Sequence, residues 1–166
     1  MQPKKNGKVL IFGAGGRVGL GLISEFMRNN IDIVAIDNID KSLLSQKVAR
    51  LAIDNRISSD PGESVITVYG NIDVLDEDII TPILAEEQPD AVVNYAIPFT
   101  WDAAKQLDNY DQISRACLGA FSCIQVLAPR VIAGAIFKSG ISASFIVGNL
   151  PDITIPVIYK TSTSRD

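Results

Sequence analysis

The sequence predicts an α/β fold, in which a doubly wound parallel sheet lies between helices in a three-layer α/β/α arrangement. Short apolar segments rich in valine and isoleucine alternate with longer amphipathic segments along almost the whole chain. Most of the short segments are apolar at successive positions, which is typical of strands buried on both faces of a parallel sheet. With 166 residues, 47% of them hydrophobic, the chain is long enough for one domain with a sizeable core.

Five segments are predicted to be strands, because they are short, apolar and rich in β-branched residues. In chain order they are Lys8–Phe12, Asp32–Asp37, Ser64–Tyr69, Asp90–Ala96 and Ser142–Gly148. Strands and helices alternate, with two helices before the last strand. This order implies right-handed crossovers and an open sheet covered on both faces.

The segments between the strands carry apolar residues at helical spacing. Helices are predicted over Arg17–Asn29, Asp40–Asp54, Glu77–Glu87, Asp111–Leu127 and from Pro129 to about Lys138. The buried faces expected for the first three are Val18, Leu22, Ile23 and Phe26, then Leu43, Leu44, Val48 and Leu51, then Ile80, Ile83 and Leu84. Asp40 suits an N-cap, Pro89 ends the third helix, and Pro129 suits the first turn of the last one.

Five glycines fall within KVLIFGAGGRVGLGL, from Lys8 to Leu22, although glycine inside a strand or helix costs about 0.5–1 kcal/mol relative to alanine. They are explained if a strand is followed by a tight turn and a helix, because the turn and the start of the helix need residues without a side chain. Gly13 permits the turn, and Gly19 lets the helix press against the strand. Gly15 and Gly16 let backbone N–H groups approach a pyrophosphate at the positive end of the helix. The spacing therefore predicts a Rossmann-type site that binds a dinucleotide.

The context of the glycines strengthens this prediction, since a strand precedes them, a helix follows, and an acidic residue closes the next strand. That residue is Asp37, eighteen positions after Gly19. Its carboxylate would accept hydrogen bonds from the adenosine ribose and repel a 2′-phosphate, which favours NAD over NADP. Arg17 faces phosphate in this arrangement and keeps NADP as the less favoured alternative. Val18, beside Arg17, and Asn38, beside Asp37, are also expected cofactor contacts.

Three segments carry a resemblance to a known family: GAGGRVG, GNIDVLDED (Gly70–Asp78) and QPDAVVNYA (Gln88–Ala96). They resemble NAD(P)-binding Rossmann-fold dehydrogenases, in particular the extended short-chain dehydrogenases/reductases, which include NAD-dependent epimerases and dehydratases. The resemblance implies an oxidoreductase or a sugar-nucleotide epimerase or dehydratase. It also implies cofactor contacts, with adenine beside Ile72 and Asp73 and the cofactor ribose along Asn94, Tyr95 and Ala96. Ile97, the next residue, is a further expected cofactor contact.

A second resemblance is to the N-terminal domain of the lactate and malate dehydrogenases. It rests on the glycine loop and on SFIVGNLPDITIPVIYK, Ser144–Lys160. It implies that a fifth strand is followed by an asparagine that helps to bind substrate and nicotinamide ribose, and then by an apolar helix. Asn149 would be that asparagine, with Pro151 displaced by one residue.

Hydride transfer to a carbonyl needs a proton donor beside the oxygen, and neither resemblance supplies one in this chain. No tyrosine is followed four residues later by lysine, the pair of the short-chain enzymes, and there is no histidine for the lactate/malate mechanism. The catalytic residues are therefore unknown. Three hypotheses stay open: an enzyme part with catalytic residues beyond Asp166, a non-catalytic dinucleotide-binding or sensing module, and a scaffold that self-associates through Ala116–Phe137.

We expect a single domain over residues 1–166, with the N-terminal part of a longer protein as an alternative. A net charge of −4 and the lack of a large Lys/Arg cluster argue against a nucleic-acid partner. Polar residues interrupt the longest apolar stretch, so no membrane span is predicted. Cys117 and Cys123 match no zinc spacing and indicate a cytoplasmic protein without a metal site. A dinucleotide, a small-molecule substrate of unknown kind and a second copy of the chain are the expected partners.

Overall fold

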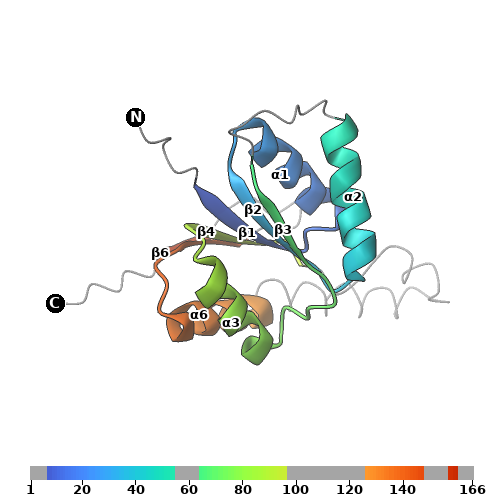
Figure 1. Ribbon diagram of the computed structural model, residues 1–166. Coiled ribbons are helices and arrows are strands. Elements are labelled where there is room, and N and C mark those ends of the chain that lie inside the picture. The colour runs from blue at the N-terminus through green and yellow to red at the C-terminus, as the bar shows by residue number, and fades with distance from the viewer. Residues whose placement is uncertain (1–6, 55–63, 97–125, 148–156, 161–166) are drawn as a thin grey trace, which may run out of the picture.

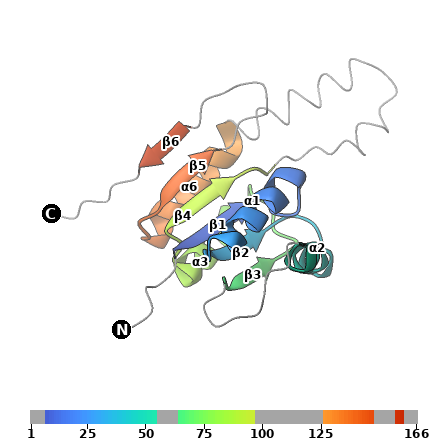
Figure 2. The same ribbon diagram turned by 90° about the horizontal axis from the view of Figure 1, so that it is seen from above.

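The computed structural model describes residues 7–54, 64–96 and 126–147, and the backbone of the strand at 157–160. These residues form one six-stranded sheet in the order β3-β2-β1-β4-β5-β6 (Figure 2). The strands are β1 (Lys8–Phe12), β2 (Asp32–Ile36), β3 (Ile66–Tyr69), β4 (Ala91–Asn94), β5 (Ser144–Val147) and β6 (Val157–Lys160). All five predicted strands are therefore present, each within the expected range.

The first five strands pair in parallel, as the sequence predicts. Leu10 at the centre of β1 faces Val34 of β2 on one side and Val92 of β4 on the other. Chain order runs outward from β1 in both directions, so the predicted doubly wound topology is confirmed. The carboxyl ends of β1 and β4 consequently meet at the point where the strand order reverses.

The last strand corrects one prediction. The lactate/malate resemblance implies an apolar helix at the end of Ser144–Lys160, but Val157–Lys160 forms strand β6. It pairs antiparallel with β5, with Ser144 opposite Lys160. A short segment with Val, Ile and Tyr in succession favours a strand, and the edge of β5 supplies its backbone partners.

Helices cover both faces of the sheet (Figure 1). One face carries α1 (Arg17–Arg28) and α2 (Lys41–Asp54), and the other carries α3 (Glu77–Glu87) and α6 (Ala128–Ser139). Each face has its own buried core, to which alternate residues of a strand contribute. In β1, Leu10 and Phe12 face α3 and α6, whereas Val9 and Ile11 face α1 and α2. The sheet is thus buried on both faces, as continuous apolar strands require.

Most of the predicted helix features are confirmed. Asp40 caps α2, since its Oδ1 accepts hydrogen bonds from the backbone of Ser42 and Leu43. Pro129 lies in the first turn of α6. The predicted helix Asp111–Leu127 lies outside the described residues except for its last two positions. Among the described helices, none has the length and apolar character needed to cross a membrane.

Two residues of the predicted buried faces are exposed instead. Val18 is 48% exposed in the first turn of α1, where the residues that reach the core are Gly19, Ile23 and Met27. Leu43 is 45% exposed in the first turn of α2, while Leu44 and Val48 are buried.

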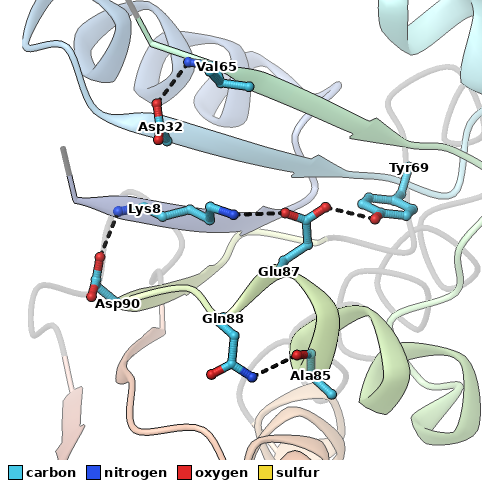
Figure 3. A network of polar contacts seen from close by, with 8 residues as sticks. All are labelled: Lys8, Asp32, Val65, Tyr69, Ala85, Glu87, Gln88 and Asp90. Atoms are coloured by element: carbon cyan, nitrogen blue, oxygen red, sulfur yellow. Dashed lines mark hydrogen bonds and ion pairs between the residues drawn. The ribbon is translucent and has the colours of Figure 1, made fainter. Parts of the chain in front are cut away.

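A polar network ties α3 to the sheet (Figure 3). The carboxylate of Glu87, near the end of α3, accepts a hydrogen bond from the Tyr69 hydroxyl at 2.8 Å. Its other oxygen lies 3.1 Å from Lys8 Nζ, and the Glu87 side chain is only 10% exposed. Burial first, and then the hydrogen bond and charge of Glu87, raise the pKa of Tyr69 to about 12. The network therefore keeps the phenol protonated.

The Tyr69 shift predicts an alkaline weakening of the fold. In the unfolded chain the phenol titrates near its ordinary pKa of about 10, whereas in the folded chain it keeps its proton up to about 12. The stability contributed by protonated Tyr69 is complete below pH 10 and is lost as the pH rises towards 12. Urea unfolding at pH 8, 10 and 11 should show a steeper decline for the wild type than for Tyr69→Phe. Parallel declines would contradict the prediction.

Candidate functional site

The candidate site lies where the carboxyl ends of β1, β2 and β4 meet, beside the reversal of strand order. Ligands of open α/β sheets bind in the crevice at such a point. Three connections gather there. Residues 13–16 join β1 to α1, residues 37–40 join β2 to α2, and Tyr95 and Ala96 follow β4. The predicted residues Ile97 and Asn149 lie outside the described residues.

Gly13 and Gly19 have the packing tasks that the sequence predicts. Gly13 has φ +75, and an added Cβ would lie 2.5 Å from the carbonyl oxygen of Tyr95. A Cβ on Gly19 would fall on the carbonyl oxygen of Gly13 and 2.7 Å from the Cα of Ala14. Since these obstacles are backbone atoms, no side-chain rotation can relieve them. Both glycines are therefore needed to build the turn itself.

Gly16 differs from them. It has an ordinary φ of −78, it is exposed, and a Cβ added there would come no closer than 3.4 Å to any atom outside its chain neighbours. That distance is an ordinary van der Waals contact. The protein's own packing therefore does not require glycine at this position.

Gly15 corrects the sequence prediction. We expected its missing side chain to leave room for phosphate at an open N–H group. Instead Gly15 is buried, and its N–H donates to Oδ2 of Asp37 at 2.7 Å. A Cβ would meet Ile39 Cδ1 at 2.7 Å and Leu44 Cδ1 at 3.2 Å. Both atoms are the far ends of flexible side chains that can turn aside, so it is the hydrogen bond to Asp37, and not a lack of space, that distinguishes Gly15 from the prediction.

The start of α1 is prepared for an anion. Gly16 is the N-cap and offers no side-chain cap, and the first turn holds no acidic residue. Helix geometry leaves the N–H groups of the first residues, Arg17 and Val18 among them, without partners inside the helix. Both residues are exposed next to Gly16. Free N–H groups and the positive end of the helix dipole favour a phosphate at this place.

Asp37 lies beside this loop, half-buried after β2. Besides Gly15 it accepts a hydrogen bond from the Ile39 backbone, at 3.3 Å on Oδ1. Because a carboxylate has about four acceptor positions, two remain for another donor such as a pair of hydroxyls. Asn38 follows and is exposed. The structure therefore brings Gly16, the start of α1 and Asp37 together at the edge of the sheet where β1 and β2 end; this edge is called the rim of the site.

The β3 connection forms the next part of the rim. Ile72 donates its N–H to the carbonyl oxygen of Asp37 at 3.0 Å, and Asn71 donates to that of Ile39 at 2.8 Å. Ile72 is half-buried and packs on the core under α3. Asp73 is exposed, and its Oδ1 accepts the N–H of Leu75 at 2.9 Å. Ile72 is thus next to Asp37, whereas the Asp73 carboxylate is engaged in the turn before α3.

Lys47 was missed as a candidate for the site, whereas the resemblance places Asn94 along the cofactor ribose. Lys47 of α2 donates from Nζ to the carbonyl oxygen of Gly15 at 2.9 Å. Asn94, at the end of β4, is fully buried, and its Oδ1 accepts the N–H of Ala96 at 3.1 Å. Among the described residues, Asn94 Nδ2 has no hydrogen-bond partner. An amide at the end of an apolar strand is visible in the sequence; the reach of Lys47 is visible only once α2 is placed.

These features fit an adenine dinucleotide. An unfilled glycine position and an uncapped helix start suit a diphosphate, and a carboxylate with spare acceptor positions suits a ribose diol. Within the described residues no group of three or more His, Cys, Asp or Glu gathers in a way that would hold a metal ion.

Residues 7–117 match the family described as the RmlD substrate binding domain, and this is more than half of the chain. The chain belongs to this family. The match covers the glycine loop, Gly70–Asp78 and Gln88–Ala96, which are the segments on which the short-chain dehydrogenase/reductase resemblance rests, and it also covers Asp37. A search among curated protein sequences found no match.

Solved structures share the fold of this RmlD-family chain. UDP-glucose-4-epimerase from Stenotrophomonas maltophila, crystallised with NAD and formylated UDP-arabinopyranose, has a TM-score of 0.57 at 19% identity, over 82% of this chain and 35% of its own. WbmG from Bordetella bronchiseptica, in complex with NAD, has a TM-score of 0.52 at 18% identity, over 86% and 37%. A short-chain dehydrogenase/reductase family oxidoreductase from Burkholderia thailandensis has a TM-score of 0.52 at 22% identity, over 82% and 47%.

The comparisons confirm the predicted resemblance to extended short-chain dehydrogenases/reductases and epimerases, and with it the Rossmann-type fold. The RmlD-family chain spans less than half the length of these three proteins.

Proposed function

We propose that the chain is the NAD-binding part of an oxidoreductase or of a sugar-nucleotide epimerase or dehydratase. The observation that carries this proposal is Gly16. It is an exposed glycine at the uncapped start of α1, it is not required by the protein's packing, and it lies in the same loop as Gly15, which Asp37 holds. The family and the fold of the NAD-bound structures support the same ligand.

In the proposed complex each part of the rim takes one part of the cofactor. The N–H groups of Arg17 and Val18 bind the diphosphate over Gly16, and Asp37 accepts the hydroxyls of the adenosine ribose. Ile72, with Asn38 and Asp73 beside it, borders the adenine. Tyr95, Ala96, Ile97 and Asn149 are the residues proposed for the nicotinamide half. When bound, NAD supplies a hydride acceptor; the chain's residues hold and orient it.

A binding or sensing module without catalysis is the second candidate. No tyrosine of this chain is followed four residues later by lysine, and the Tyr69 hydroxyl is already bonded to the buried Glu87. The described residues therefore supply a cofactor site without an assigned proton donor. Turnover of a sugar nucleotide or a carbonyl substrate by the purified chain would favour the enzyme over the module.

Calorimetric titration with NAD and NADP tests the proposal. We expect NAD to bind at least about tenfold more tightly, a difference of about 1.4 kcal/mol, because the Asp37 carboxylate repels a 2′-phosphate. Asp37→Asn keeps an oxygen for the Gly15 N–H but loses the charge, and should reduce the difference in affinity between NAD and NADP. Absence of heat with either dinucleotide would contradict the function. Equal affinities would contradict the role of Asp37.

A further inference from the structure

The peptide groups on either side of Gly15 are held by three hydrogen bonds. The Gly15 N–H donates to Asp37 Oδ2 at 2.7 Å. The Gly15 carbonyl accepts from Lys47 Nζ at 2.9 Å, and the Gly16 N–H at the other end of that peptide donates to the Gly13 carbonyl at 3.2 Å. The second and third bonds fix both ends of the Gly15–Gly16 peptide. Lys47 is the only one of these partners that comes from α2.

The register of α2 explains why Lys47 reaches the loop. Leu44 is buried in α2 with its Cδ1 against the position of a Gly15 side chain. Residues three apart on a helix share a face, so Lys47 lies on the same side one turn later. It is half-buried there, whereas Arg50, a further turn along, is exposed. The packing of Leu44 thus aims Lys47 at the Gly15 carbonyl.

We propose that Lys47 is a positioning residue of the dinucleotide site, which acts on the diphosphate through the Gly15–Gly16 peptide. This inference rests on the proposed function. Glycine peptides flip easily because neither φ sign is excluded. A flip would turn the Gly15 carbonyl away from Lys47, break the bond of Gly16 to Gly13, and change the start of α1 where the diphosphate binds. The ammonium holds the binding orientation before the ligand arrives.

The charge of Lys47 has a second effect. The site combines the Asp37 carboxylate with a ligand diphosphate, and these negative charges repel one another. An ammonium held on Gly15, the residue that Asp37 also contacts, lowers this repulsion from the side of α2. Both effects strengthen the binding of phosphorylated ligands and leave an uncharged nucleoside almost unaffected.

The test compares Lys47→Met, Lys47→Arg and Arg50→Met in the full chain, with calorimetric titration of NAD, ADP and adenosine. Lys47→Met should weaken NAD and ADP about tenfold, the loss expected for one charge-assisted hydrogen bond. Adenosine affinity should stay within about twofold, because adenosine has no phosphate. Lys47→Arg, which keeps a charged donor, should retain most of the wild-type affinity for NAD and ADP. Arg50→Met removes the same charge from the same helix without this bond and should bind as the wild type does.

The outcomes separate this inference from the function on which it rests. If the wild type binds NAD and Lys47→Met binds it equally well, the role of Lys47 is overturned and the function stands. Equal weakening of adenosine and ADP would also overturn it, since a general loosening of the site would then explain the loss. If the wild type binds none of the ligands, both the function and the role of Lys47 fall.

Discussion

Replacement of Gly19 by alanine is expected to lower the free energy of unfolding by about 3 kcal/mol or more, the upper end for overpacking. The new Cβ would fall on the carbonyl oxygen of Gly13 and within 2.8 Å of the carbonyl oxygen of Ala14. These are backbone atoms of the turn that joins β1 to α1. The helix can make room only by moving off the sheet, and Ile23 and Met27 would then lose part of their burial.

Gly21 provides the matched control for this substitution. It lies two residues further along the same helix, and a Cβ there meets nothing within 4 Å. Gly21→Ala should therefore leave stability unchanged or raise it by up to about 1 kcal/mol, since alanine favours a helix. Urea unfolding of Gly19→Ala and Gly21→Ala measures the difference in their free energies of unfolding. A Gly19→Ala protein as stable as Gly21→Ala would mean that α1 does not press on the turn as closely as the structure has it.

The sequence predicts the architecture well because burial acts on whole segments. Continuous apolar strands such as Lys8–Phe12 are compatible only with a sheet covered on both faces, and the structure buries β1 against both cores. Helix starts are also local, so Asp40 could be predicted as a cap from its position alone. Strand β6 could not, since its state depends on the edge of β5, a partner that no local pattern identifies.

The candidate site divides along the same line. Gly13, Gly19 and Asp37 follow from local spacing, and the structure puts them in one loop system. The N–H of Gly15 was expected to be open to phosphate, but it donates to Asp37, a contact that depends on how the connection after β2 folds against the loop. Lys47 was missed for the same reason. The spacing shows which glycines belong to the loop. Whether protein or ligand lies beside each glycine depends on how α2 packs, which the spacing does not show.

Gly16 is where ligand and packing can be separated by experiment. Gly16→Val should leave the fold intact at a cost of about 1 kcal/mol, because valine is a poorer N-cap than glycine. Its φ of −78 and ψ of 169 are allowed for valine, and the nearest atom to the new Cβ is 3.4 Å away. The branched side chain would project from the start of α1 into the space proposed for the diphosphate. The valine side chain would clash with the bound diphosphate but with nothing in the unbound protein, so the cost of overpacking, about 3 kcal/mol, weakens only the complex. Affinity for NAD should consequently fall on the order of 100-fold.

The measurement pairs thermal unfolding without ligand with calorimetric titration of NAD, and Gly21→Ala serves again as the control that binds like the wild type. Gly19→Ala tests whether the turn itself needs the glycine, and Gly16→Val tests whether the ligand needs it. Loss of stability in Gly19→Ala with retained stability in Gly16→Val would show that the turn needs one vacancy for itself and keeps the other for its ligand. A Gly16→Val protein that is folded and binds NAD with unchanged affinity would contradict the proposed diphosphate position, because valine and phosphate cannot share that space.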